Sequence, residues 1–316
     1  MDMRMGAPFI RGFCAGFSPD FSSIIAVHGL NPKGRKDSEH AWDTWRTPPG
    51  PSGRLWLRDD LPKQLPDSRV FLYQYNSTAW YGKDKSNFVD KANALLEAIR
   101  LKRRSDEKRP LLLLGHSLGG LLIKQALINA CNNEKYQQIK LATKGLVFFA
   151  TPHRGGNGSW VSLGYLAAKI TSRGDTILQA LDKGSMFTDL LHEHCRHRLL
   201  DFDIVSFWGT LDHIVSKESA SLGLPGNREN VVSLDADHSS ICKFGVSVTD
   251  KDNLETVLGN IQDLAENALK IDELSSLGGL AIFQGCTLRV PHQLDSPSAR
   301  DSGLMDRIYI NSTCLG

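Results

Sequence analysis

Six short apolar runs recur along this chain of 316 residues and constrain its fold more than any other feature. Each run is bounded by turn-forming residues and lacks the polar–apolar alternation of a strand that is buried on one face only. Such runs are typical of parallel strands that are buried on both faces of a sheet. They are residues 23–28, 70–75, 111–115, 145–150, 203–207 and 230–234.

Helical patterns separate several of these runs. Residues 88–101 carry apolar side chains at helical spacing, and residues 118–130 repeat the pattern. Strands that alternate with helices form a mainly parallel sheet with helices on both faces. The sequence therefore predicts the α/β class with a doubly wound sheet.

Four segments depart from this rhythm or flank it. Residues 21–270 are predicted to form the α/β domain, after an N-terminal extension at residues 1–20. Residues 31–66, rich in Pro, Gly, Trp and charge, are predicted to form a long loop with a short helix. Residues 155–200 contain no convincing strand and are predicted to form a helical insertion, a lid over the site. The tail, residues 271–316, loses periodicity from about residue 286 and is predicted to be partly disordered.

The composition argues against several classes of protein. The formal net charge is only +2, whereas a nucleic-acid-binding protein needs a concentrated basic face. The six cysteines are scattered without a CxxC pair, which is typical of a reducing compartment. No run approaches the roughly 18 apolar residues that a membrane span needs. We expect a cytoplasmic protein with no transmembrane segment and no cofactor.

The sequence Gly-His-Ser-Leu-Gly at positions 115–119 matches the pattern G-x-S-x-G. It directly follows an apolar strand and precedes a helix, which is the context of the nucleophile in the α/β-hydrolase fold. The serine of such a motif sits on a strained turn, so small residues must flank it where the chains approach. We predict that Ser117 is the nucleophile.

Gly29 directly follows the predicted strand at residues 23–28, in the sequence His28-Gly29-Leu30. In this fold the oxyanion hole takes one backbone N–H from the residue after the nucleophile and another from the loop after an early strand. The candidates are therefore the N–H groups of Leu118 and Leu30, with Gly29 permitting the turn. The side chain of His28 is expected to brace the loop rather than to transfer protons.

The acid and the base should follow the serine in the chain order Ser, Asp or Glu, His. Asp212 comes just after the strand at residues 203–207, and His238 comes after the strand at residues 230–234. We predict that His238 is the general base and that Asp212 orients it. Asp235 and Asp237 are rival acids, but they lie so close to His238 in sequence that facing its ring from behind is harder.

Three further features offer less specific signals. The histidine-rich stretch at residues 192–197 resembles a metal site, but its spacing is not H-E-x-x-H, and we expect no metal there. His153 is expected to be structural. The apolar stretch at residues 160–170 supplies the candidate lid and substrate-binding residues Trp160, Tyr165 and Leu166.

Taken together, five motifs resemble the lipase-like serine esterase domain of fungi, over about residues 20–265. This domain is related to the GPI-inositol-deacylase-like lipases and to the serine-active-site-containing protein of mitochondria. Many of its members carry a glutamate about where Gly209 stands, so this chain departs from the family pattern there. The motifs are Val27-His28-Gly29-Leu30, Trp56-Leu57-Arg58-Asp59 with Leu61-Pro62, Gly115-His116-Ser117-Leu118-Gly119-Gly120, Phe149-Ala150-Thr151-Pro152-His153-Arg154-Gly155 and Asp237-His238-Ser239-Ser240-Ile241-Cys242.

The resemblance implies a serine hydrolase that cleaves a small acyl or lipid-like ester through an acyl-enzyme. Peripheral membrane contact and a mitochondrial association are weaker implications, and the oligomeric state is not implied. In fungi the domain often opens NOD-like receptor chains, so a signalling module with little catalysis is one alternative. The other alternative is an accessory hydrolase, thioesterase or acyltransferase of a fungal biosynthetic pathway.

Overall fold

The computed structural model of the chain divides, by its internal contacts, into a compact unit Met1–Leu274 and a second unit Ser275–Gly316. The sheet and the candidate site belong to the first unit. The residues that the structure describes are 9–13, 22–31, 34–77, 86–153 and 197–285.

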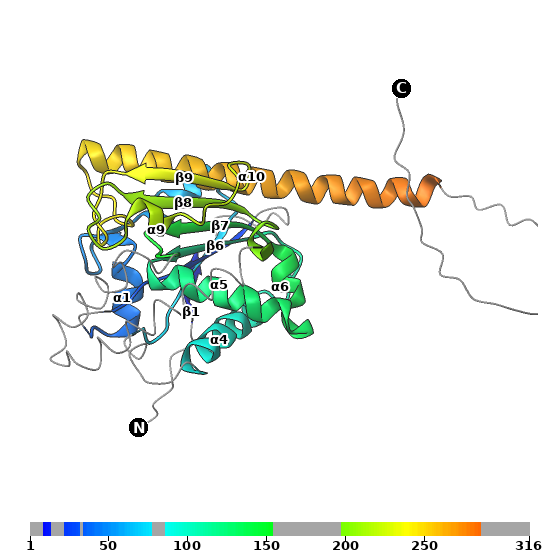
Figure 1. Cartoon of the computed structure of the whole chain (residues 1–316), viewed down its shortest axis with the longest axis horizontal. Helices are drawn as coiled ribbons and strands as arrows, with labels where there is room; N and C mark the ends of the chain where they lie inside the picture. Colours follow the sequence, from blue (N-terminus) through cyan, green and yellow to red (C-terminus); the bar gives the residue numbers. More distant parts are fainter. Residues whose placement is uncertain (1–8, 14–21, 32–33, 78–85, 154–196, 286–316) are drawn as a thin grey trace, which may run out of the picture. The chain divides into compact units, whose positions relative to one another are not determined.

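The first unit is built on a seven-stranded sheet with the strand order β1-β5-β2-β6-β7-β8-β9 (Figure 1). Strands β2 to β9 in this sheet are parallel to one another, and β1 pairs antiparallel with β5 at the edge. The predicted α/β class is therefore confirmed. The strands are β1 Phe9–Phe13, β2 Ser23–Val27, β5 Arg69–Tyr73, β6 Leu111–His116, β7 Thr143–Phe149, β8 Asp203–Gly209 and β9 Glu229–Leu234.

Helices cover both faces of this sheet. In Figure 1, α4 and α5 lie against one face, whereas the part of α10 that belongs to the first unit lies along the other. The longer helices are α4 Ser86–Lys102, α5 Leu118–Cys131 and α10 Val248–Gly285, and the shorter ones are α1 Asp37–Asp43, α2 Trp56–Asp59, α3 Leu61–Gln64, the 3-10 helix Glu134–Tyr136, α6 Gln137–Ala142 and α9 Lys217–Ala220.

The strands are apolar throughout because each one feeds two cores. In β2, Ile25 and Val27 pack with α4 and α5 in one core, and Ile24 and Ala26 pack with α10 in the other. All four side chains are fully buried. Burial on both faces removes the alternation that a half-exposed strand would show, which is why continuous apolar runs identified the sheet.

The segment at residues 31–66 is more structured than the sequence predicted. In place of a long loop with one short helix, it holds α1, α2, α3 and a two-stranded ribbon of β3 Arg46–Thr47 and β4 Arg54–Leu55. Trp45 and Trp56 are buried in the second core and anchor this segment. The prediction was wrong because each element is too short to display a periodicity of its own.

The N-terminal end of the predicted domain differs from expectation, because strand β1 lies within residues 1–20, which the sequence assigned to an extension. At the other end α10 continues to Gly285, close to residue 286, where the predicted tail loses its periodicity. The helix begins where Ser247 Oγ accepts a hydrogen bond from Asp250 N–H, an N-terminal cap that the sequence pattern did not reveal. Residues 286–316 lie outside the described part of the chain.

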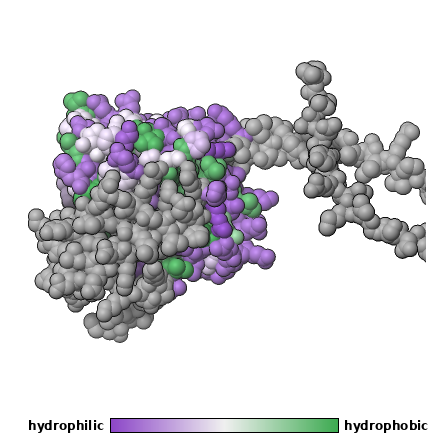
Figure 2. Space-filling view, viewed as in Figure 1, coloured by the Kyte–Doolittle hydropathy of each residue, from purple (hydrophilic) through white to green (hydrophobic). Residues whose placement is uncertain are grey.

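The exposed surface of the described residues is mixed in character. On the face drawn in Figure 2, apolar residues form small separate spots among hydrophilic ones. The described helices include none with the length and apolar character that crossing a bilayer requires.

Candidate active site

Ser117 lies on a sharp turn between β6 and α5, at the carboxyl edge of the sheet. Its backbone has φ 51° and ψ −120°, a conformation with positive φ that residues other than glycine rarely adopt. The N–H of Ser117 donates to the carbonyl of Phe149 at the end of β7, over 2.9 Å, which holds the turn. Strain of this kind persists only where the surrounding structure over-determines the backbone, as it does at this turn.

The glycines around Ser117 are required by close packing. A Cβ on Gly119 would overlap with the carbonyl oxygens of Val27 and His28, and one on Gly120 would overlap with the side chain of Thr151. A Cβ on Gly29 would lie 3.0 Å from Ser117 Cβ. The turn of the serine and the loop after β2 are therefore pressed against each other.

The structure brings Ser117, His238 and Asp212 into one line of hydrogen bonds. Ser117 Oγ lies 3.0 Å from His238 Nε2, and His238 Nδ1 lies 2.9 Å from Asp212 Oδ2. All three side chains are buried, and that of Asp212 is fully so. They come from the ends of three parallel strands, β6, β8 and β9, which meet at the same edge of the sheet.

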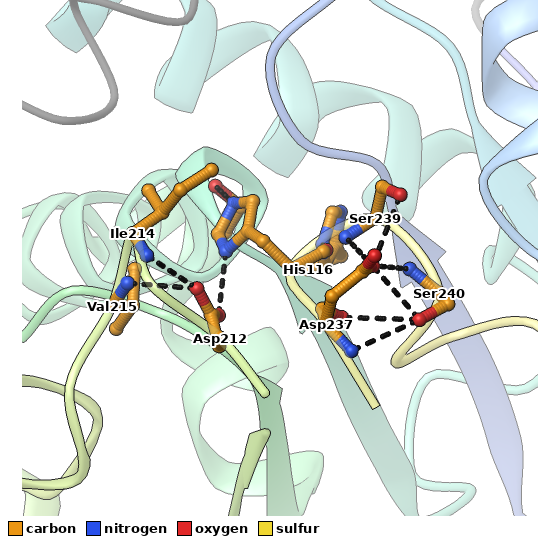
Figure 3. A network of polar contacts seen from close by, with 9 residues as sticks. His116, Asp212, Ile214, Val215, Asp237, Ser239 and Ser240 are labelled. Atoms are coloured by element: carbon orange, nitrogen blue, oxygen red, sulfur yellow. Dashed lines mark hydrogen bonds and ion pairs between the residues drawn. The ribbon is translucent and has the colours of Figure 1, made fainter. Parts of the chain in front are cut away.

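The carboxylate of Asp212 is held from behind by the backbone. Its Oδ1 accepts hydrogen bonds from the N–H groups of Ile214 and Val215, at 2.7 and 2.9 Å (Figure 3). This leaves Oδ2 for His238. Because the carboxylate only accepts, His238 Nδ1 must carry the proton and His238 Nε2 is free to accept from the serine. This is the tautomer that a general base needs.

The rival acids belong to other networks. Asp237 Oδ1 accepts from the hydroxyl of Ser240 and from the backbone N–H groups of Ser240 and Ser239 (Figure 3). Despite partial burial, which acts to raise it, these hydrogen bonds hold the pKa of the Asp237 carboxyl below its usual value. Asp235 Oδ1 accepts from the hydroxyl of Thr210. Among the described residues, Asp212 is thus the carboxylate bonded to the ring of His238.

Gly209 has no room for a side chain. A Cβ there would overlap with the carbonyl oxygen of Ala236 and lie 3.2 Å from Asp212 Cβ. A glutamate side chain therefore cannot be accommodated at residue 209 of this backbone. In this chain the carboxylate facing His238 is supplied three residues later.

The same packing makes Gly209 a sensitive position for stability. We expect Gly209→Ala to lower the free energy of unfolding by about 1–3 kcal/mol, because the clash involves rigid backbone. Gly226→Ala is the matched control, since its Cβ would meet nothing within 4 Å, and we expect it to change stability by less than about 0.5 kcal/mol. Urea unfolding followed by circular dichroism measures both, and equal effects would contradict the packing argument.

The loop after β2 presents one of the two predicted oxyanion donors, and the start of α5 presents the other. Within the described part of the chain, neither Leu30 N–H nor Leu118 N–H donates a hydrogen bond to a backbone or side-chain acceptor. Leu118 is the first residue of α5, so its N–H also lies at the positive end of the helix dipole. Both N–H groups are therefore candidates for an oxyanion hole.

His28 braces this loop, as the sequence suggested. Its Nε2 accepts from the N–H of Tyr75, so Nδ1 carries the proton and donates to the carbonyl of Gly29 at 2.8 Å. Tyr75 stacks on the ring and donates its hydroxyl to the carbonyl of His28 at 3.0 Å. Burial lowers the pKa of His28 to about 3, so the ring is neutral.

His116, the variable residue of the serine motif, also contacts the site. Its Nε2 donates to the carbonyl of His238 at 2.9 Å, and the two rings lie 5.2 Å apart. Burial, followed by the neighbouring His238, holds the pKa of His116 well below its ordinary value. Nothing in the sequence predicted this role of His116 except its place inside the serine motif.

Other predicted residues fall into two groups. The side chain of His153 is fully buried against Phe148, and the backbone N–H of His153 donates to the carbonyl of Ser219. Both contacts fit a structural role. Trp160, Tyr165 and Leu166 lie outside the described residues, as does the stretch at residues 192–196. Within the described ranges, no group of three or more His, Cys, Asp and Glu residues is arranged to hold a metal ion.

Comparison with known proteins finds distant relatives. The chain is 25% identical to human Protein SERAC1 over 259 residues, which are 71% of this chain and 36% of that protein. The mouse protein of the same name is 25% identical over 264 residues, 73% of this chain and 37% of that protein. The chain therefore spans about a third of the length of these relatives. No family model matches it.

Solved structures resemble the chain more extensively. The carboxylesterase EstE1 from a metagenomic library superposes with a TM-score of 0.51, at 15% identity, over 80% of this chain and 83% of that one. The chain has the α/β-hydrolase fold. The lipase BlEst2 of Bacillus licheniformis superposes with a TM-score of 0.50, at 15% identity, over 80% of this chain and 98% of that one.

The α/β-hydrolase fold explains where the candidate site lies. The chain leaves β2 for β5 on one side and then returns to β6 on the other, so the loops after β2 and β6 diverge at this point of the sheet. Ligands of open α/β sheets bind in the crevice at such a point, beyond the carboxyl ends of the strands. Ser117 and Leu30 lie on the two loops that border it.

Proposed function

We propose that this α/β-hydrolase domain is a serine hydrolase that cleaves acyl esters through Ser117, His238 and Asp212. The observation that carries the proposal is the unbroken line of hydrogen bonds from Ser117 Oγ to the Asp212 carboxylate, starting from a strained nucleophile turn. A buried serine that is bonded to a histidine of the correct tautomer is activated for attack on a carbonyl carbon.

Each residue then has a defined role in the reaction. His238 Nε2 takes the hydroxyl proton as Ser117 Oγ bonds to the carbonyl carbon, and the N–H groups of Leu30 and Leu118 bind the oxyanion. Asp212 stabilises the imidazolium that forms. His238 then protonates the leaving alcohol, and a water molecule that it activates cleaves the acyl-enzyme.

The substrate class is the less specific part of the proposal. Two of the structural neighbours are named a carboxylesterase and a lipase, which supports a small acyl or lipid-like ester. The lid role of Trp160, Tyr165 and Leu166, the cytoplasmic location, the peripheral membrane contact and the kinship with fungal esterases stay predictions. Turnover of p-nitrophenyl esters, phospholipids and acyl thioesters by the pure protein would rank the ester and thioester alternatives.

A fluorophosphonate probe tests the nucleophile directly. We expect covalent labelling of the folded protein at Ser117, located by mass spectrometry, and at least a ~100-fold slower rate of labelling in His238→Ala, because the hydroxyl loses its base. Ser239→Ala is the matched control, since Ser239 is an exposed serine beside His238, and it should label like the parent. A folded protein that fails to react, or that reacts at another serine, would contradict the proposal and favour a signalling module.

A further inference from the structure

The carbonyl of Gly29 receives two imidazole donors. His28 Nδ1 lies 2.8 Å from this oxygen, and His40 Nε2, which comes from α1, lies 3.3 Å from it. The two rings meet edge to face, with their centroids 4.9 Å apart. A carbonyl oxygen only accepts, so each of these nitrogens carries its proton and donates.

The peptide that carries this carbonyl also carries the predicted oxyanion donor. The bond between Gly29 and Leu30 is trans, so its C=O and N–H point in opposite directions. Two donors that fix the direction of the Gly29 carbonyl therefore also fix the direction of the Leu30 N–H, which points the opposite way in the same peptide plane. The missing Cβ of Gly29 brings this peptide against Ser117.

The neighbouring peptides are fixed as well. The carbonyl of His28 accepts from the hydroxyl of Tyr75. After Leu30, the side chain of Asn31 donates to the carbonyl of Arg35 at 2.7 Å and accepts from its N–H at 3.2 Å. Because the chain is held before and after it, the Gly29–Leu30 peptide has little freedom to rotate, and the two imidazoles determine its plane.

We propose that His40 and His28 are positioning residues of the oxyanion hole, which clamp the Gly29 carbonyl and so aim and polarise the Leu30 N–H. This inference rests on the proposed serine hydrolase function. Donation to the carbonyl polarises the amide, which strengthens the hydrogen bond that its N–H gives to an oxyanion. Neither histidine touches the substrate.

His40 is the better residue for a test, because its side chain is only partly buried, whereas His28 has no exposed surface. His40→Gln keeps an N–H donor near the position of Nε2, and His40→Met has a similar length without a donor. Both variants are neutral at this position. The pair therefore isolates the hydrogen bond to the Gly29 carbonyl.

The measurements are the kcat and KM of p-nitrophenyl butyrate hydrolysis and the Ki of a trifluoromethyl ketone, which forms a tetrahedral adduct with an oxyanion. In His40→Met we expect kcat to fall about 10- to 50-fold, less than the ~100- to 1,000-fold cost of deleting a donor. KM should stay within about twofold, and Ki should rise by the same factor as kcat falls. His40→Gln should stay within about threefold of the parent in all three quantities.

Hydrogen–deuterium exchange of the peptide spanning residues 22–31 provides a readout that needs no turnover. We expect faster exchange in His40→Met than in His40→Gln at equal melting temperature, because the loop loses one of its anchors. If the parent protein hydrolyses no ester, the proposed function fails. The exchange rates alone then test whether His40 holds the loop through the Gly29 carbonyl. Parent-like kinetics and exchange in His40→Met, or equal losses in the two variants, would overturn the inference.

Discussion

Asp212→Asn is expected to lower kcat for ester hydrolysis by about 10,000-fold, with little change in KM. The structure makes the reason specific. The N–H groups of Ile214 and Val215 both point at Oδ1, so they would retain the amide oxygen there and turn the amide NH₂ toward His238. His238 Nδ1 would then have to accept, which places the ring proton on Nε2. In that tautomer the ring cannot take the proton of Ser117.

Asp237→Asn and Asp235→Asn are the controls for this prediction, because these were the rival acids. The asparagine oxygen at residue 237 can still accept from the N–H groups of Ser239 and Ser240, so the loop that carries His238 should survive. We expect both control variants to stay within about fivefold of the parent kcat. A loss in Asp237→Asn that matched the loss in Asp212→Asn would contradict the assignment of the acid.

A second large effect is expected on acidification. Burial lowers the pKa of His28 to about 3 and that of His40 to about 4, from an ordinary value of 6.5 in the unfolded chain. Below pH 6.5 the unfolded chain therefore binds protons at these two rings and the folded chain does not. The free energy of unfolding falls as the pH falls below 6.5. Between pH 6.5 and pH 5 each ring should cost about 2 kcal/mol. The buried ring of His116 acts in the same direction.

The groups that face these rings reinforce the effect. Lys243 and Arg35 are cations near His40, and His40 itself disfavours a charge on His28. Together the two rings should lower the melting temperature by roughly 10–15 °C between pH 7 and pH 5, as measured by circular dichroism. His40→Gln removes one of the titrating rings, so its melting temperature should fall distinctly less. If the melting temperatures of the two proteins fell equally with pH, protonation of His40 would not be a cause of the lost stability.

The sequence patterns identified most strands of the sheet and two of its helices, but they missed the edge strand and several short elements. Runs such as residues 111–115 identified parallel strands because their alternate residues enter two cores, and the two helical patterns, at 88–101 and 118–130, matched α4 and α5. Strand β1 was missed because Arg11 interrupts its apolar stretch. The small elements around Trp45 and Trp56 were missed because tertiary contacts, rather than local periodicity, hold them.

At the site, chain order and local motifs pointed to Ser117, Asp212 and His238, which the structure places together. They did so because each residue follows a strand directly. His40 had no such signal: it reaches the Gly29 carbonyl only because α1 folds back over the loop after β2. The lack of space at Gly209 was equally hidden, since the carbonyl of Ala236 that fills it comes from the loop after a later strand.

The strand order also has a consequence for how the protein is made. Ser117 is contributed by β6 in the middle of the sheet, whereas Asp212 and His238 follow β8 and β9, which are translated later and are added at one edge. In the proposed serine hydrolase, a chain that ends before β9 would therefore carry Ser117 without His238, and its nucleophile would lack a general base.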